Sequence, residues 1–377
     1  MTDKKARKIY CTAMFVDLVN SSMHSKVLGI EDYAERLREF SITMKAAYSE
    51  FFKNEQCLKV NEKAYRKEIE PRGDEVFILF STDTSKPDNA DDVLTAIKLA
   101  LQMKFAWKRR LVELEKSIEI KQHIELAVGI NQGQMAAFTN DQEEIEGIEG
   151  YEINYAKRVE SFSRIGKYTN IFLSEKTRNI FKSANMIFEK YEDCDLRGID
   201  EHVNLYEVKE FLFQSMPSIY DEAMSQLFQR IRKDRLLASG KSWLEQYMIN
   251  ILFNTYCQKK LDHYKEKILE FINDSYHRDL LFYRFLKAYL LEDEFLFLKL
   301  QYYQEIVKER PSYTLARKEI IRLYEHLCDK VNKIEPLALQ VKNYIDELMK
   351  FHLDLIEQNE REMYGKILSR INSLIPS

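Results

Sequence analysis

Glycine and proline are scarce in this chain of 377 residues, which contains 10 glycines and 6 prolines. An average glycine content near 7% would give about 26 glycines. The scarcity excludes collagen-like and low-complexity chains, and it argues against an all-β protein built on glycine-rich turns. Eight glycines lie at or before Gly198, and only Gly240 and Gly365 follow. We therefore expect special turns in the first half and mostly uninterrupted helix in the second.

Cysteine pairs, charge of one sign and long apolar runs are also lacking. The five cysteines are widely spaced, and the seven histidines show no metal-ligand spacing. We therefore expect neither a disulfide framework nor a zinc site, and this cysteine usage fits a reducing cytoplasm. The net charge of −4 gives no general electrostatic case for binding nucleic acid or an anionic membrane. No apolar run approaches the ~20 residues of a membrane span, and the first residues show no signal-peptide pattern. We expect a cytoplasmic protein without nucleic-acid or membrane partners.

The apolar pattern predicts a mixed sheet with helices over roughly the first 210 residues, an α+β or α/β organisation. A hairpin is expected around Asn131-Gln132-Gly133, between strands at 122–130 and 135–138. The remaining expected strands are 8–16, 64–70, 75–80, 171–173 and 204–208, and the expected helices are 22–52, 90–116 and 150–165.

From Met216 onward, helical periodicity predominates. Arg310-Pro311-Ser312-Tyr313, followed by Ala316, faintly resembles a tetratricopeptide repeat boundary, but no full period repeats, and an irregular helical bundle is the alternative. The expected helices are 217–238, 241–259, 261–274, 277–291, 293–309, 313–332, 335–357 and 360–373.

Three polar motifs in the first half carry residue types suited to phosphate chemistry. Asp17 ends a predicted buried strand just before a predicted helix start, where backbone N–H groups can bind phosphate and a carboxylate can bind a divalent cation. Asp74 stands at a predicted hairpin turn. Asn154 and Arg158 are four residues apart on a predicted helix and share a face that suits a polyphosphate. Taken singly, each also has a structural explanation, as a helix cap, a turn residue or an exposed polar stripe.

Together and in this order, the motifs resemble the catalytic domain of class III nucleotidyl cyclases, the adenylate and guanylate cyclase family, over roughly residues 7–210. The segment 128–133 is similar to the family's glycine-bearing hairpin, and 196–199 before 204–208 is similar to its C-terminal end. The resemblance implies an α+β, ferredoxin-like cyclase domain over 1–212. We expect an all-α helical domain over 213–377, tetratricopeptide-like in one interpretation, that regulates the enzyme or binds an unknown regulator.

The resemblance also implies the reaction and its metal ligands. The ribose 3′-hydroxyl of a nucleoside triphosphate attacks the α-phosphorus, and pyrophosphate leaves. Asp17 and Asp74, with the backbone carbonyl of Leu18, would hold two divalent cations per site, Mg²⁺ or Mn²⁺. Carboxylates are suitable ligands for these hard ions. Two metals roughly 4 Å apart can lower the pKa of the hydroxyl and neutralise the leaving group.

Further roles follow from the same resemblance. Asn154 would orient the ribose, Arg158 would stabilise the pentavalent phosphorus, and Arg197 would touch the triphosphate. In this family catalytic domains pair head to tail, so a homodimer would have two equivalent sites, each with Asp17 and Asp74 from one chain and Asn154 and Arg158 from the other. The backbone that would bind the β- and γ-phosphates is that of Asn20, Ser21 and Ser22.

The base cannot be assigned to a purine by the same comparison. Adenylate cyclases have a Lys where this chain has Glu70, and an Asp or Thr where it has Gly147, so the adenine-reading pair is absent. Glu70 matches the guanylate cyclases, but Gly147 does not match their usual Cys, so guanine is half supported.

We favour a pyrimidine, because segments 17–22 and 71–75 look closer to the bacterial pyrimidine cyclases of Pycsar antiphage systems. Glu70 could accept a hydrogen bond from uracil N3–H or from the cytosine amino group, and Arg72 could donate to a pyrimidine carbonyl or face solvent. The N3–H argument favours UTP and cUMP slightly over CTP and cCMP. Adenine and guanine stay open as alternatives.

Two other functions compete with a cyclase. A catalytically dead scaffold is disfavoured because Asp17, Asp74, Asn154 and Arg158 are all present. A diguanylate-cyclase or polymerase-palm enzyme is disfavoured because segment 71–75 only partly resembles its turn, and the helix with Asn154 and Arg158 decides against it.

Overall fold

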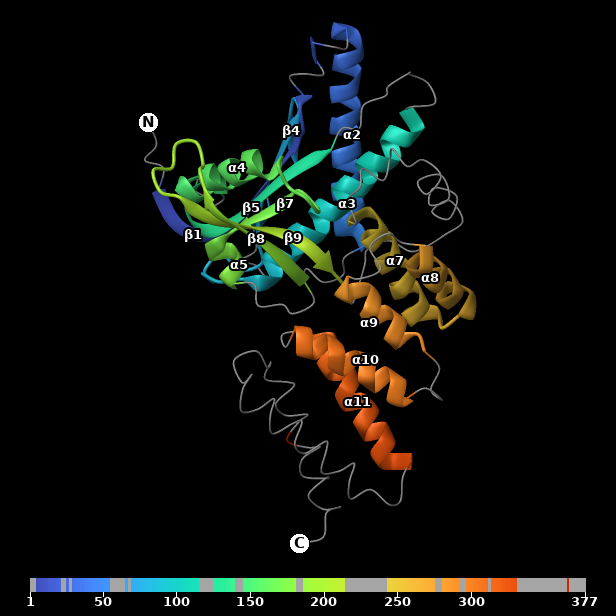
Figure 1. The fold of residues 1–377 in the computed structure, drawn as a ribbon. Coiled ribbons are helices and arrows are strands. Elements are labelled where there is room, and N and C mark those ends of the chain that lie inside the picture. Colours follow the sequence, from blue (N-terminus) through green and yellow to red (C-terminus); the bar gives the residue numbers. More distant parts are fainter. Residues whose placement is uncertain are drawn as a thin grey trace. The chain divides into compact units, whose positions relative to one another are not determined.

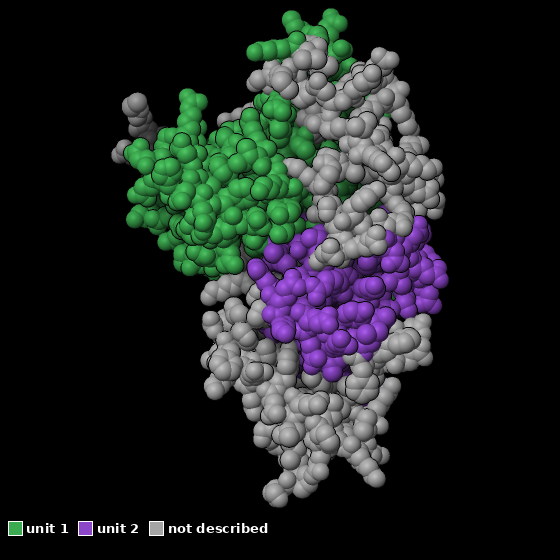
Figure 2. Space-filling model, in the orientation of Figure 1, with its two compact units in different colours: residues 1–182, 188–209, 214–258 green, residues 183–187, 210–213, 259–377 purple. Residues whose placement is uncertain are grey.

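The computed structural model describes residues 5–21, 25–26, 29–54, 65–66, 69–114, 125–139, 145–180, 186–213, 243–274, 280–291, 296–310, 313–330 and 365. The chain divides into two compact units, coloured green and purple in Figure 2. Unit 1 comprises residues 1–182, 188–209 and 214–258, and unit 2 comprises residues 183–187, 210–213 and 259–377.

Unit 1 is built on a nine-stranded mixed sheet (Figure 1). Its strand order is β2-β4-β1-β5-β7-β9-β8, with β3 paired to β4 and β6 paired to β5. The β5–β7 pair is parallel, and β1 is antiparallel to both of its neighbours. The strands are β1 (Lys5–Leu18), β2 (Tyr65–Arg66), β3 (Glu70–Arg72), β4 (Glu75–Ser81), β5 (Leu126–Thr139), β6 (Ile145–Glu149), β7 (Ile171–Ser174), β8 (Met186–Cys194) and β9 (Val203–Phe211).

Helices cover both faces of this sheet, as the burial of β1 requires. Cys11 and Ala13 belong to an apolar cluster with Ala156 of helix α4, whereas Met14 and Val16, which alternate with them, point to the other face and are equally buried. A strand buried on both faces reads as a continuous apolar run, and this run is what the sequence shows. The helices of this unit are α2 (Ile30–Asn54), α3 (Ala90–Leu114), α4 (Tyr151–Ser163), α5 (Glu175–Ile180) and α7 (Trp243–Lys259, of which the last residue lies in unit 2).

The hairpin expected around Asn131-Gln132-Gly133 is wrong, because β5 runs without a turn from Leu126 to Thr139. Its glycines serve packing instead. A Cβ on Gly129 would lie 2.2 Å from the backbone N of Glu160, and one on Gly133 would lie 2.6 Å from the Glu152 side chain. The glycines therefore let helix α4 lie directly on the strand, and β5 forms its hairpin further on, with β6.

Unit 2 contains helices α8 (Asp262–Asp274), α9 (Leu281–Tyr289), α10 (Leu296–Glu309) and α11 (Thr314–Lys330). The ring of Phe285 lies 5.5 Å from that of Tyr303 and 5.8 Å from that of Tyr313, so aromatic side chains join α9, α10 and the start of α11. The helices expected at 217–238, 335–357 and 360–373 fall almost wholly outside the described residues. None of the helices that the structure describes has the length and apolar character to span a membrane.

The fold class expected from the sequence, an α+β domain followed by helical segments, is confirmed. The expected domain boundary at 212 stays a prediction. Compactness groups α7 with unit 1, because Tyr247 lies ring to ring with Phe105 of α3, 4.9 Å between centroids.

Candidate functional site

Strands β1 and β4 bring the two predicted metal-binding aspartates to one end of the sheet. The antiparallel register places Asp17 opposite Glu75, and the backbone N–H of Leu18 donates to the carbonyl of Asp74 at 3.1 Å. Asp74 lies in the tight turn before β4, directly after Gly73, whose φ of 68° is in the left-handed region that favours glycine. A buried strand end and a two-residue turn thus fix both carboxylates at the same edge.

The segment after β1 turns sharply toward Asp74. Asn20 has a φ of 61°, a left-handed conformation that asparagine tolerates better than most residues. The buried Ser21 then donates its hydroxyl to Asp74 Oδ2. Ser22 lies outside the described residues. The chain therefore joins the predicted phosphate-binding segment to the second aspartate through one side-chain hydrogen bond.

Three carboxylates gather at this edge, from Asp17, Glu75 and Glu160. One oxygen of each lies within 4.8 Å of one oxygen of the other two. We call these residues the acidic trio. Glu160 is fully buried on α4, and Asp17 is only 5% exposed, so two of the three charges are withdrawn from water. Among the described residues this is the only acidic, cysteine or histidine group close enough to share one metal ion.

Two cationic side chains of the segment from α4 to Arg164 contact the trio. Lys157 Nζ lies 2.7 Å from Glu160 Oε2 and 3.4 Å from Asp17 Oδ2, and it also ion-pairs with Glu75. Arg164 Nη2 lies 2.6 Å from Asp17 Oδ2 and 3.4 Å from Glu160 Oε1. Both cations contact Asp17 through the same oxygen, Oδ2.

The surroundings of Asp17 suit a divalent cation. Burial and then the charge of Glu160 raise the pKa of Asp17 to about 7, while Lys157 and Arg164 act in the opposite direction. Its other oxygen, Oδ1, is buried and has no hydrogen-bond partner in the described part of the chain. Buried carboxylate oxygens without partners are costly, and hard cations such as Mg²⁺ prefer oxygen ligands. The residues present therefore fit a bound metal ion.

Asn154 and Arg158 are rotated around α4 from the residues that contact Asp17. At about 100° per residue, Asn154 is about 60° and Arg158 about 100° around the helix from Lys157, both in the same direction. Glu160 and Arg164 lie on the opposite side of Lys157. No hydrogen bond or ion pair among the described residues connects Asn154 or Arg158 with Asp17 or Asp74 of the same chain.

The other predicted residues are spread over unit 1. Arg197 is exposed in the turn after β8, before Gly198, whose φ is 80°. Glu70 and Arg72 lie on β3, opposite Phe77 and Glu75, and their side chains lie outside the described part of the structure. Gly147 on β6 pairs with Phe138, and a Cβ placed on it would meet no atom within 4 Å.

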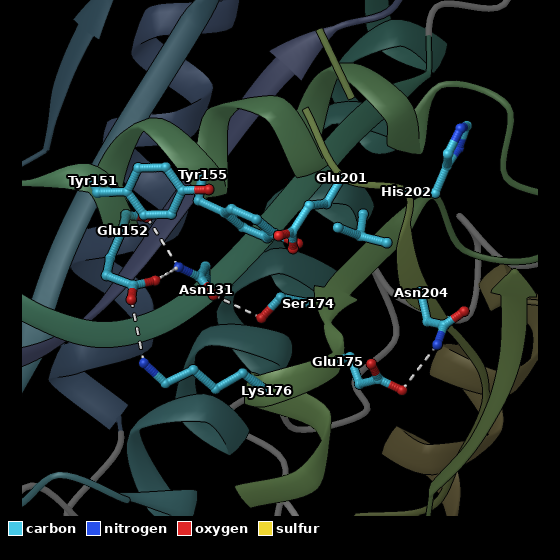
Figure 3. A pocket seen from close by; sticks show the side chains of 11 residues that line it. Asn131, Tyr151, Glu152, Tyr155, Ser174, Glu175, Lys176, Glu201, His202 and Asn204 are labelled. Carbon is cyan, nitrogen blue, oxygen red and sulfur yellow. Dashed lines mark hydrogen bonds and ion pairs between the residues drawn. The ribbon is translucent and has the colours of Figure 1, made fainter. Parts of the chain in front are cut away.

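A separate polar cavity of about 360 Å³ is lined on α4 by Tyr151, Glu152 and Tyr155 (Figure 3). Its polar groups are paired within the chain. Asn131 donates to Glu152 Oε2 at 2.7 Å, Glu152 also pairs with Lys176, and Asn204 donates to Glu175. These pairs hold α4 to β5 and to the start of α5.

The sequence analysis missed four residues of the acidic edge. Glu75 directly follows a predicted metal ligand, and the pairing of β1 with β4 places it opposite Asp17. Lys157, Glu160 and Arg164 recur at spacings of three and four, which marks one face of a helix. The signal was therefore present, but it lay beside the stronger Asn154/Arg158 motif.

Comparisons with known proteins give one family match. The family model described as the adenylate and guanylate cyclase catalytic domain matches residues 5–210, more than half of the chain. No curated protein matches the sequence.

Several solved structures are similar over this region. The adenylyl cyclase CyaB from P. aeruginosa is 20% identical, with a TM-score of 0.42, over 55% of this chain and 96% of that one. The guanylyl cyclase Cya2 is 20% identical, with a TM-score of 0.41, over 55% of this chain and 94% of that one. The guanylate cyclase domain of RhGC from Catenaria anguillulae, in complex with GTP, is 19% identical, with a TM-score of 0.38, over 54% of this chain and 99% of that one.

Proposed function

Because the chain belongs to the adenylate and guanylate cyclase catalytic domain family, we propose that it converts a nucleoside triphosphate to a 3′,5′-cyclic nucleotide and pyrophosphate in a shared, metal-dependent site. The observation that carries this proposal is the surroundings of Asp17. Its buried carboxylate belongs to the acidic trio and has an oxygen without a partner among the described residues. The strand partner of Asp17 is Glu75, which directly follows Asp74. A scaffold without catalysis would not need a buried acid close to a second, half-buried acid at the end of a strand.

Asp17 and Asp74 would hold the metal, with the backbone carbonyl of Leu18, and Glu75 lies close enough to add a ligand. When bound, divalent cations lower the pKa of the ribose 3′-hydroxyl and neutralise charge on the leaving pyrophosphate. Mg²⁺ and Mn²⁺ are the ions that such oxygen ligands prefer. The role of the protein is then to hold the carboxylates at fixed positions, which the β1–β4 register supports.

The triphosphate would lie against the turn after β1. The left-handed backbone at Asn20 and the hydrogen bond from Ser21 to Asp74 support a fixed loop there, and backbone N–H groups at such a turn bind anions. Ser22 would complete this segment. Arg197, exposed after β8, would contact the triphosphate of a site formed with a second chain.

Asn154 and Arg158 would orient the ribose and stabilise charge on the phosphorus, in the site of a partner chain. Their position on α4, away from the face that meets Asp17, supports a head-to-tail homodimer. The same stripe of the helix carries Tyr151, 62% exposed, and continues to Ile165, 61% exposed just beyond the helix end. Exposed apolar side chains on both sides of two polar ones suit a contact with another protein surface.

For the base, we propose a pyrimidine, UTP before CTP, with Glu70 and Arg72 as readers. Gly147 supports a departure from the purine cyclases, because the family's second base-reading position has no side chain here. A Cβ at Gly147 meets no atom within 4 Å, so Gly147→Asp should be accommodated. Combining it with Glu70→Lys would supply the adenylate-type pair, and we expect the ratio of ATP product to UTP product to rise.

The cyclic product would serve as a second messenger, cUMP or cCMP, in antiphage defence. This part rests on the resemblance of segments 17–22 and 71–75 to the Pycsar cyclases. Guanylate or adenylate cyclase activity in general signalling is the second candidate, and Glu70, which suits guanine, favours GTP within it.

The test is to incubate the protein with ATP, GTP, CTP or UTP and Mn²⁺ and to identify any cyclic product by mass. Asp17→Ala and Asp74→Ala should each abolish the product, because each removes a metal ligand. Asp88→Ala, which removes an exposed carboxylate before α3, is the matched control and should keep it. Product that survives both ligand substitutions would overturn the metal site, and cGMP or cAMP as the main product would overturn the pyrimidine assignment.

A further inference from the structure

A lysine of the chain itself forms ion pairs with the acidic trio. The Lys157 ammonium contacts all three members, at 2.7 Å from Glu160, 3.4 Å from Asp17, and in an ion pair with Glu75. Arg164 reaches only two of them, Asp17 and Glu160. Lys157 therefore contacts every member of the acidic trio.

The packing around Lys157 directs its side chain toward the acidic trio. Its ammonium lies 5.6 Å from the ring centre of Phe15, which stacks on Phe77 at 4.5 Å. The β1–β4 register pairs Phe15 with Phe77 and, two residues on, Asp17 with Glu75, so the aromatic pair and the acidic pair share one face of the sheet. Lys157 extends along that face from rings to carboxylates, and a cation over a ring adds to the attraction.

Lys157 can also leave this position without moving the helix. Its side chain is 30% exposed, whereas Glu160 on the same helix is fully buried. Helix α4 itself is fixed, because it lies backbone to backbone against Gly129. A lysine side chain has four rotatable bonds and a compact, strongly hydrated charge. The ammonium can therefore turn into water while the three carboxylates stay in place.

A divalent cation and the Lys157 ammonium need the same oxygens. Like charges within a few ångströms repel strongly in a partly buried site, so the two cannot both sit among the trio. We propose that Lys157 is a tethered counter-ion that occupies the trio in the metal-free chain and must be displaced for a divalent cation to bind. Lys157 then sets the metal concentration at which the site loads. This inference rests on the metal site of the proposed function.

The test measures Mn²⁺ binding to the full chain without nucleotide, from the electron paramagnetic resonance signal of free Mn²⁺. Lys157→Met removes the charge and keeps the apolar stem, and it should lower the Kd for Mn²⁺ about tenfold, a typical size for coupling between two bound species. Lys167→Met, which removes an exposed lysine ten residues away, is the control and should leave the Kd within about twofold. Asp17→Asn should abolish the site and so identify it.

A second measurement keeps the inference testable if Lys157→Met weakens the fold. Without metal this variant should melt at a lower temperature than the native chain, because three carboxylates lose a counter-ion, and Mn²⁺ should raise its melting temperature more than it raises that of the native chain. Lys157→Arg, which keeps the charge, should bind Mn²⁺ like the native chain. Unchanged or weaker Mn²⁺ binding by Lys157→Met would overturn the inference.

The two proposals can fail separately. Tighter Mn²⁺ binding by Lys157→Met, with no cyclic product from any of the four nucleotides, would support the counter-ion and contradict the cyclase. Cyclic product from the native chain, with an unchanged Kd in the variant, would contradict only the counter-ion.

Discussion

Glu125 shows how a single buried charge is held in unit 1. It stands just before β5 and pairs with two lysines of α3, Lys104 at 2.7 Å and Lys108 at 2.8 Å, and Lys104 also donates to the carbonyl of Leu126. Burial on its own would raise the pKa of Glu125, but the two ammonium groups outweigh it and hold the pKa at about 2. Both lysine side chains are almost fully buried, and both pair with this carboxylate.

We expect Glu125→Gln to lower the free energy of unfolding by about 3–5 kcal/mol at pH 7, because breaking a buried ion pair strands the remaining charges. The folded pKa lies below the ordinary value of 4.5, so the contribution is present above pH 4.5 and is lost as pH falls toward 2. The gap between native and variant should therefore narrow between pH 4.5 and pH 2. Denaturant unfolding followed by tryptophan fluorescence measures it, and Glu113→Gln, on an exposed pair with Arg110, should have little effect.

Two glycines near the site differ in the space that a side chain would have, so they can be compared directly. A Cβ on Gly129 would lie 2.2 Å from a backbone nitrogen of α4, whereas one on Gly147 would meet nothing within 4 Å. We expect Gly129→Ala to destabilise unit 1 by at least about 2 kcal/mol, since helix or strand must shift. Gly147→Ala should change stability by less than about 0.5 kcal/mol. Equal stability of the two variants would contradict the close approach of α4 to β5.

At the scale of elements, the strand β5 shows where sequence reasoning succeeded and where it failed. The apolar run and the glycines were recognised, but Asn131-Gln132-Gly133 was interpreted as a turn. In the structure the amide of Asn131 binds Glu152 of α4, and that of Gln132 binds Thr12 and the carbonyl of Asn89. Local turn chemistry cannot distinguish a loop from a strand whose polar side chains are satisfied by distant elements.

The candidate site also contains residues that the sequence predicts and residues that it does not. Asp17, Asp74, Asn154 and Arg158 could be found because each belongs to a short motif with a fixed spacing. Lys157 meets Asp17 and Glu75 only through packing, across separations of 140 and 82 positions in the chain. Contacts of that kind depend on the register of β1 with β4 and on the seat of α4 at Gly129, which no single segment encodes.

The sequence analysis places helix α7 in the helical domain, whereas in the structure it packs within unit 1. Trp243 is buried, with the Lys104 ammonium 5.0 Å from its ring centre, and Tyr247 lies against Phe105. We expect Trp243→Ala to cost unit 1 about 3–5 kcal/mol, the usual range for deleting a buried aromatic side chain.

Fluorescence can follow this change, because the chain has two tryptophans and the other, Trp107, is buried in α3 of the same unit. Leu261→Ala, at an exposed position, is the control. If Trp243→Ala left the unfolding of Trp107's surroundings unchanged, α7 would not belong to this unit.

For the whole molecule, we propose that the helical region regulates the cyclase and contributes nothing to its chemistry. None of the candidate catalytic residues lies beyond Arg197, and unit 2 has its own aromatic core. A chain that ends at Gln258 keeps α7 and should bind Mn²⁺ with the Kd of the full chain. A chain that ends at residue 212 loses α7 and should be less stable by the contribution of Trp243 and its neighbours. Loss of Mn²⁺ binding from the longer piece would contradict a purely regulatory role.

The residues of α4 suggest a test of how many chains build one site. Lys157 and Glu160 meet Asp17 of their own chain, and Asn154 and Arg158 lie farther around the same helix. We propose that a complete site takes Asn154 and Arg158 from a second copy, so that a two-fold symmetric pair would hold two such sites.

Mixing two inactive variants tests this sharing. Asp74→Ala and Arg158→Ala homodimers should each be inactive, because every site lacks one group. In a heterodimer one site combines the intact Asp74 of one chain with the intact Arg158 of the other, while the second site carries both defects. Random pairing of equal amounts makes half of the dimers mixed, so the cyclic product should recover to about a quarter of the native rate. No recovery, with heterodimers confirmed by native mass spectrometry, would mean that each chain builds its site alone.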